Sequence, residues 1–177
     1  MTIHVTQEPV RLEGYQAIFR PSEKYGNHTL SAVVDDQLIQ LLSDERPAAL
    51  DWARSRAKNP RRVTEKYEPW EEVSSGKYQV KFSWKPDNKP PIVDSEGTPI
   101  EEEIPLWSGS LVKLAFKQKP YVTPDAIGTS LKLVAIQVIQ SAGQAGVDRG
   151  DLDATEAAAL FGQTTGFKIN EPNVIRS

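Results

Sequence analysis

The chain has 177 residues, with 21 Lys and Arg against 24 Asp and Glu, a formal net charge of −3 and a mean hydropathy of −0.46. This length fits one domain, and a hydrophobic content of 38% is enough to bury a single core. No apolar run approaches the roughly 20 residues that cross a bilayer, and the N-terminus shows no secretory signal. Cysteine is absent, which excludes disulfides and thiolate chemistry and indicates a cytoplasmic protein.

The common catalytic and cofactor-binding motifs are missing as well. The sequence contains only the histidines His4 and His28, no paired-histidine zinc motif, and neither of the two glycine-rich loops that bind phosphate groups. We therefore expect no catalytic residue, no metal ion and no cofactor, and the sequence favours a binding protein over an enzyme.

The first elements along the chain are a predicted strand pair and a predicted helical segment. Residues 15–34 alternate in hydrophobicity around a turn that begins at Pro21, which predicts two antiparallel strands. The apolar spacing then becomes helical. Because proline disrupts a helix interior, Pro47 predicts a division into two helices, at about 36–43 and 47–58.

The second half of the chain predicts three further strands. Residues 61–76 are charged and indicate a surface excursion, and residues 77–85 show the cleanest alternation in the chain. Residues 92–105 indicate a loop or a hairpin arm. The last two strands are expected at 110–117 and 130–140.

These elements define the expected fold class and domain organisation. Five strands with a helical insertion between the second and third match a mainly β fold, a small Greek-key barrel. We expect this domain over residues 1–141. Residues 142–177 shift to Gly, Ala, Asp, Gln and Thr and predict a C-terminal tail, with one short helix near 153–161.

The predicted strand faces combine aromatic rings with lysines. Lysines can track phosphates while rings stack on bases, which is how single-stranded nucleic acid is held. In the alternative interpretation, the rings fill the barrel core and the lysines are merely solvated. The residues concerned are Tyr78, Phe82, Trp84, Lys77, Lys81 and Lys85, then Trp107, Lys113, Phe116, Lys117, Lys119 and Tyr121.

Two other charge clusters allow two interpretations each. The basic cluster from Arg54 to Lys66 could contact nucleic acid, but a solvated helix end, with cations favoured by the helix dipole, explains it more simply. The acids Asp94, Glu96 and 101–103 could form the metal site of a nuclease. Consecutive acids on a loop are more typical of a solvated surface.

The last two predicted strands lie in a segment that resembles a known family. Residues 106–121 read LWSGSLVKLAFKQKPY, and residues 128–139 read GTSLKLVAIQVI. This segment is similar to the replication single-stranded DNA-binding proteins of tailed bacteriophages, and a weaker similarity covers residues 15–34. The resemblance implies an OB-fold that binds single-stranded DNA without base specificity, in the replication, recombination and repair of phage DNA.

The resemblance also implies which residues contact the DNA. The matching positions are Lys113, Lys117, Lys119 and Tyr121, together with Arg20 and Tyr25 near the start of the chain. From the strand pattern we add Lys77 and Lys81 as phosphate contacts, and Trp84 and Trp107 as rings that stack on bases.

Members of this family often end in an acidic tail that recruits replication proteins and competes with DNA. Residues 142–177 carry five acidic and three basic residues, so this tail is only weakly acidic. The candidate partners are single-stranded DNA, a DNA polymerase, a helicase-primase and a second copy of the chain in a homodimer. The expected location is the cytoplasm of the infected bacterial host. The alternative function is an OB-fold protein-interaction module without nucleic-acid affinity, which suits the nearly balanced charge.

Overall fold

The computed structural model describes residues 2–141 and 154–167, and the chain divides into two compact units, 1–146 and 147–177. The described elements in chain order are β1 (His4–Val5), β2 (Val10–Leu12), β3 (His28–Asp35), α1 (Asp36–Arg56), β4 (Thr64–Glu65), β5 (Trp70–Ser74), β6 (Lys77–Trp84), the 3-10 helix η1 (Pro86–Asn88), β7 (Ile92–Val93), β8 (Leu111–Val122), β9 (Ala126–Gln140) and α3 (Ala154–Phe161). All of them except α3 belong to the first unit.

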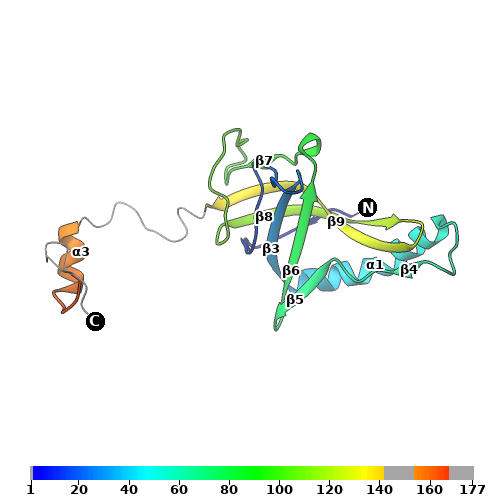
Figure 1. The fold of residues 1–177 in the computed structure, drawn as a ribbon, viewed down its shortest axis with the longest axis horizontal. Helices are drawn as coiled ribbons and strands as arrows, with labels where there is room; N and C mark the ends of the chain where they lie inside the picture. The colour runs from blue at the N-terminus through cyan, green and yellow to red at the C-terminus, as the bar shows by residue number, and fades with distance from the viewer. Residues whose placement is uncertain (1, 142–153, 168–177) are drawn as a thin grey trace. The chain divides into compact units, whose positions relative to one another are not determined.

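The first unit is mainly β. Its strands form one sheet in the order β4-β9-β8-β2-β3-β6-β5, with β1 paired to β8 and β7 paired to β9. The antiparallel pair of β8 and β9 is the longest, and it runs from Leu111 opposite Gln140 to Val122 opposite Ile127. Figure 1 shows the sheet curling into a half-barrel, with α1 packed against the two long strands.

The hydrophobic core lies on the inner side of this curl. Side-chain alternation turns Leu114 and Phe116 of β8 inward, where they meet Phe82 of β6 and Leu42 of α1. The rings of Phe82 and Phe116 contact each other edge to face, with centroids 5.2 Å apart. Trp70 of β5 packs against the same core. Because Leu114 and Phe116 of β8 face the core, the residues of β8 at the positions between them lie on the outer side of the sheet.

The predicted division of the helical segment at Pro47 is wrong, because α1 is one continuous helix. Its first turn is capped by Asp35, whose Oδ1 accepts a hydrogen bond from the backbone N–H of Leu38 at 3.0 Å. A proline inside a helix costs about 3 kcal/mol through the lost hydrogen bond and steric conflict. Buried positions at helical spacing on both sides of the proline offset that cost, namely Ile39, Leu42, Arg46, Leu50 and Ala53.

The strand predicted within residues 15–19 is also wrong. Only Ala17 forms a bridge there, to Thr29, and the partner of β3 in this part of the sheet is β2. The side chain of Gln16 makes the backbone contacts to β3 that the missing strand would have made. Nε2 of Gln16 donates to the carbonyl of Ser31 at 2.8 Å, and its Oε1 accepts from the N–H of Ser31 at 3.0 Å. Amide side chains satisfy backbone groups in this way without strand geometry.

The other strand predictions hold, but the described residues form nine strands where five were expected. β3, β6, β8 and β9 confirm four predicted strands, and a bridge between Val93 and Pro99 confirms a hairpin arm within residues 92–105. The additional strands β1, β2, β4, β5 and β7 are two to five residues long. Such short segments show no measurable alternation.

In the second unit, α3 confirms the short helix predicted near residues 153–161. The rest of the predicted tail, 142–153 and 168–177, lies outside the described residues. Over the two ranges that the structure describes, none of the helices has the length and apolar character needed to cross a bilayer.

Candidate nucleic-acid interface

The outer side of β8 presents three lysines in a row. Lys113, Lys117 and Lys119 are partly exposed, and they alternate with buried side chains such as Leu114 that face the core. The nine residues from Lys113 to Tyr121 span about 27 Å at about 3.4 Å per step. This row matches the extended shape of a nucleic-acid strand.

A β-bulge in β9 adds a fourth lysine to this side. The register of the two strands leaves Val134 without a partner residue. Before the bulge the core-facing positions are odd-numbered, such as Leu131, and after it they are even-numbered, such as Ile136. Lys132 therefore points outward, directly opposite Lys117. We call Lys113, Lys117, Lys119 and Lys132 the β8–β9 lysine face.

The lysines of the β8–β9 lysine face are not paired with acids in the described part of the chain. Within residues 2–141 and 154–167, no Asp or Glu forms an ion pair with any of its lysines. Lys117 and Lys132 oppose each other in the ladder. Like charges directly opposite on a sheet are destabilising, so this arrangement suits an anionic partner that runs along the strands.

Tyr121 lies at the end of this face, opposite Gly128 of β9. Its ring lies so close to the glycine that a Cβ at position 128 would collide with it. The absence of a side chain at Gly128 therefore lets the ring rest on the β9 backbone. A partly exposed aromatic ring held in this way is suited to stack on a base.

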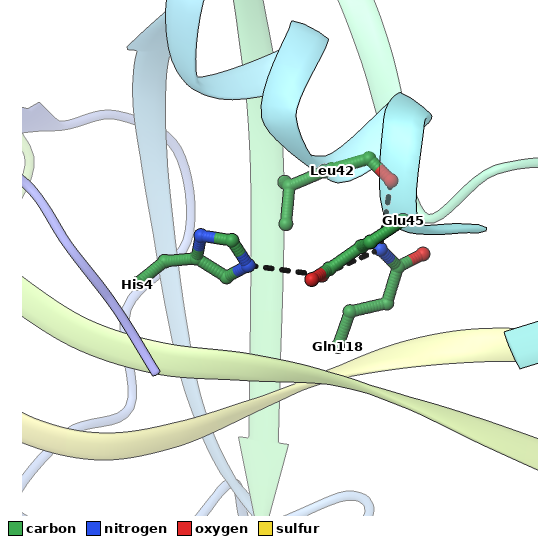
Figure 2. A network of polar contacts seen from close by, with 4 residues as sticks. All are labelled: His4, Leu42, Glu45 and Gln118. Carbon is green, nitrogen blue, oxygen red and sulfur yellow. Dashed lines mark hydrogen bonds and ion pairs between the residues drawn. The ribbon is translucent and has the colours of Figure 1, made fainter. Parts of the chain in front are cut away.

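On the inner side of β8, a polar network holds the strand against α1 (Figure 2). Nε2 of Gln118 donates to the carbonyl of Leu42 at 2.9 Å and to Oε1 of Glu45 at 3.0 Å. The same Oε1 lies 2.9 Å from Nε2 of His4 in β1. Because Gln118 stands between Lys117 and Lys119 in the chain, the network anchors the part of β8 that presents these two lysines.

Lys77 and Lys81, predicted as phosphate contacts, lie on the outer side of β6, and β3 and β2 separate them from β8. The surroundings of Lys77 are more acidic than those of the β8–β9 lysine face. Lys77 lies opposite Asp35 in the β3–β6 ladder. A hydrogen bond to Glu72 is the main reason that the pKa of the neighbouring Tyr78 is raised above its usual value. The structure does not bring Lys77 and Lys81 together with the β8–β9 lysine face.

Arg20 and Trp107 line one hollow of about 260 Å³ next to the start of β8. Trp107 is 55% exposed, and Tyr15 in the same hollow is 63% exposed. Nε of Arg20 donates to a carboxylate oxygen of Glu103 at 2.9 Å. The hollow therefore offers two exposed rings beside a guanidinium group that already has an acidic partner.

Tyr25 and Trp84 lie outside β8 and β9. Tyr25 is 71% exposed, and the ammonium group of Lys24 lies 5.1 Å from the centre of its ring. Trp84, at the end of β6, is partly buried against the core. Its ring is parallel to that of His28, with centroids 5.6 Å apart. One face of the Trp84 ring is therefore already occupied.

The acidic arm around β7 has structural contacts of its own. Oδ1 of Asp94 accepts hydrogen bonds from the backbone N–H groups of Glu96 and Thr98, at 2.9 Å each, which closes the turn. Glu103 pairs with Arg20. Among the residues that the structure describes, no three His, Asp or Glu side chains lie together as a metal site would need.

The half-barrel has the same fold as phage single-stranded DNA-binding proteins. The resemblance of the sequence to this family is therefore confirmed at the level of the fold. Three solved structures illustrate the similarity. Gp2.5, a single-stranded DNA-binding protein encoded by bacteriophage T7, matches with a TM-score of 0.64 and 19% identity, over 94% of this chain and 98% of that chain. The single-stranded DNA-binding protein of bacteriophage Enc34 matches with a TM-score of 0.58 and 12% identity, over 88% and 89%. The same protein in complex with single-stranded DNA matches with a TM-score of 0.54 and 12% identity, over 78% and 86%. No family model matches the sequence, and no curated protein matches it significantly.

Sequence reasoning assigned no role at the site to Lys132, Gly128 or Tyr15. The placement of Lys132 depends on the bulge, and the contact of Gly128 with Tyr121 depends on the register of two strands. Tyr15 was assigned to a strand that does not form, although it is an exposed aromatic residue near Arg20. A glycine inside a strand marks a close approach by another group, but this signal was hidden for Gly128 because the last strand was expected to begin only at residue 130, whereas β9 begins at Ala126.

Proposed function

We propose that this protein binds single-stranded DNA along the outer side of β8 and β9 without reading its base sequence. One observation carries the proposal: within the described residues, the four lysines of the β8–β9 lysine face lack acidic partners, and the row ends at the Tyr121 ring on Gly128. The similarity of the fold to that of a phage protein solved in complex with single-stranded DNA supports it.

The lysines and the ring make two kinds of contact. The ammonium groups neutralise phosphates and release the cations condensed on the DNA, which supplies a salt-dependent affinity. The Tyr121 ring stacks on a base, and any base can serve because every base has a π face. The protein coats and protects the strand and keeps it extended. It makes and breaks no covalent bond, so it acts as a stoichiometric binder and not as an enzyme.

The other sequence-predicted residues form a secondary set of contacts in this proposal. Arg20, Tyr25 and Trp107 would meet DNA that extends beyond the start of β8. Lys77, Lys81 and Trp84 would meet a strand that crosses the sheet to β6. The acidic neighbours of Arg20 and Lys77 make these contacts weaker than those of the β8–β9 lysine face.

The proposal includes a cellular setting. A binder of this kind serves replication, recombination and repair of phage DNA in the cytoplasm of the infected bacterium, with a DNA polymerase and a helicase-primase as partners. Residues 1–141 form the DNA-binding domain, an OB-fold extended by α1 and by short strands, and residues 142–177 form a tail. A homodimer is the proposed assembly.

The test is a titration of labelled oligo-dT and of a labelled duplex with the protein, followed by anisotropy at several salt concentrations. We expect binding to the single strand, with log affinity falling by about 0.7 per phosphate contact for each unit of log salt, hence about 3 for four lysines. The duplex should bind far more weakly. Absence of binding to oligo-dT at low salt would contradict the proposal and favour the protein-interaction module.

A further inference from the structure

We infer that the bound strand does not end at Tyr121 but crosses β9 and continues over the end of β4, where Lys66 contacts it. This inference rests on the proposed function and extends its site to residues outside the β8–β9 lysine face. The observations that support it are the pairing of β4 with β9, the direction of the Glu65 side chain and the exposure of Lys66.

The pairing of β4 places Lys66 beside Gly128. β4 runs parallel to β9, with Glu65 opposite Ile127, and the N–H of Lys66 donates to the carbonyl of Ile127 at 2.8 Å. β9 therefore lies between β8 and β4, and neighbouring strands are about 5 Å apart. Lys66, which directly follows β4, and Tyr121 of β8 lie on the two sides of Gly128, with their backbones about 10 Å apart across the sheet.

The contacts of Glu65 show which side Lys66 faces. The carboxylate of Glu65 turns toward α1, where its oxygens lie 3.5 Å from Nη2 of Arg54 and 3.8 Å from Nη1 of Arg46. Nε of Arg46 also donates to Oγ1 of Thr129 at 3.1 Å, so the odd-numbered residues at this end of β9 face α1. Because successive side chains alternate, Lys66 projects to the opposite side, where the Tyr121 ring covers Gly128.

This segment is held by its backbone while its side chains stay exposed. Nη2 of the buried Arg46 donates to the carbonyl of Lys66 at 2.6 Å. Lys66 is exposed and forms no ion pair with the described acids, and the adjacent Tyr67 is 93% exposed. A fixed backbone with an exposed cation repeats the arrangement of the lysines on β8, whereas the same alternation turns Tyr67 toward the α1 side with Glu65.

Arg56 is a matched control within the same basic cluster. It lies on α1 with its guanidinium group 5.1 Å from the centre of the Trp52 ring, so it belongs to the helix and not to the sheet. Arg56→Gln removes the same charge as Lys66→Gln. A difference between the two variants therefore reports the path of the DNA and not the net charge of the protein.

The experiment measures anisotropy with an oligo-dT series of roughly 4–16 nucleotides, the range of site sizes for OB-folds. We expect Lys66→Gln to leave binding of the shortest oligomers unchanged, and to make the salt slope for the longest ones shallower by about 0.7. Arg56→Gln should change neither, and Tyr67→Ala, which removes an exposed ring on the α1 side, is a second control with the same expectation.

The outcomes separate this inference from the function it rests on. If Lys66→Gln binds the longest oligomer with the wild-type slope while Lys117→Gln shows a shallower slope, the inference is overturned and the proposed function stands. If the wild-type protein binds no oligo-dT of any length, both fail. Because Lys66 and Tyr67 are exposed, neither variant is expected to prevent folding.

Discussion

At the scale of single residues, Tyr121 and Gly128 function as a pair. The ring occupies the space that a side chain at position 128 would take, so the ring position depends on the glycine as much as on the tyrosine. An aromatic group that is already positioned loses little conformational freedom when a base stacks on it. Each member of the pair can therefore be tested separately.

Replacement of Tyr121 tests the stacking contact. Tyr121→Ala should weaken binding of oligo-dT by about 1–3 kcal/mol, the range for one stacked base, while Tyr121→Phe keeps the ring and should bind nearly as the wild type does. Anisotropy titration at fixed salt measures both. Equal affinities for the alanine variant and the wild type would assign Tyr121 to packing alone.

Replacement of Gly128 tests the position of the ring. Gly128→Ala adds one methyl group that collides with Tyr121 and displaces its ring. We expect oligo-dT affinity to fall toward that of Tyr121→Ala, although the tyrosine is still present. Unchanged affinity in Gly128→Ala would show that stacking does not need this ring position.

Lys132 should have opposite effects on stability and on binding. Lys132→Gln removes one member of the like-charge pair with Lys117, so unfolding without DNA should require more free energy, by about 0.2–1 kcal/mol. The same variant should make the salt slope of DNA binding shallower by about 0.7. Denaturant unfolding and anisotropy measure the two quantities. Lys85→Gln, which removes an exposed lysine outside β8 and β9, should change neither; a loss of stability in Lys132→Gln would contradict the prediction.

At the scale of elements, the sequence predicted the features that a single segment determines, such as the alternation of a strand. It missed the features that depend on the pairing of two segments. The alternation of β6 and the lysines of β8 can be read within a single strand, and both predictions of secondary structure hold. Strict alternation would place Lys132 on the same side as Ile136. The bulge at Val134 reverses this, and a bulge is defined only by the partner strand.

The helix shows the same limit. A local rule predicts a break at Pro47, but α1 continues because its buried side packs on β8 and β9. Helical stability in proteins comes mostly from such packing, which one segment of sequence does not reveal. The extension of the site to β4 is equally hidden, since two residues carry no strand pattern.

The polar network between α1 and β8 gives a prediction at this scale. Gln118→Ala removes two hydrogen bonds, one to the carbonyl of Leu42 and one to the carboxylate of Glu45, which keeps its contact with His4, so the free energy of unfolding should fall by about 1–3 kcal/mol. Denaturant unfolding measures this, and the exposed Gln40→Ala on α1 is the control, expected within about 0.5 kcal/mol of the wild type. The salt slope of DNA binding should not change, because the β8–β9 lysine face keeps its four charges. Wild-type stability for Gln118→Ala would mean that the network does not hold the helix.

At the scale of the whole molecule, the net charge of −3 conceals a local separation of charge. Four lysines gather on β8 and β9, while acids concentrate around β7 and between β5 and α1. The overall charge repels DNA weakly at long range, and the β8–β9 lysine face attracts it at short range. Salt screens both effects, over about 8 Å at physiological ionic strength.

A higher salt concentration should therefore stabilise the free protein and reduce the additional stability that bound DNA provides. Raising the salt concentration screens the repulsion between Lys117 and Lys132, so the melting temperature of the free protein should rise. The added stability that oligo-dT confers should fall, because its affinity falls. Thermal unfolding with and without oligo-dT, across one salt series, measures both. A free protein that melts at lower temperature as salt increases would contradict this account of the β8–β9 lysine face.

The positions of the tryptophans have an optical consequence. Trp52 lies on α1, Trp70 and Trp84 pack against the core, and Trp107 precedes β8, so none of the four indoles stands on β8 or β9. DNA confined to these strands should leave the intrinsic emission nearly unchanged, and quenching should begin only when the strand reaches Trp107 or Trp84. Tryptophan emission that stays unchanged while DNA binds tightly would therefore place the DNA on β8 and β9. It would not be evidence against binding.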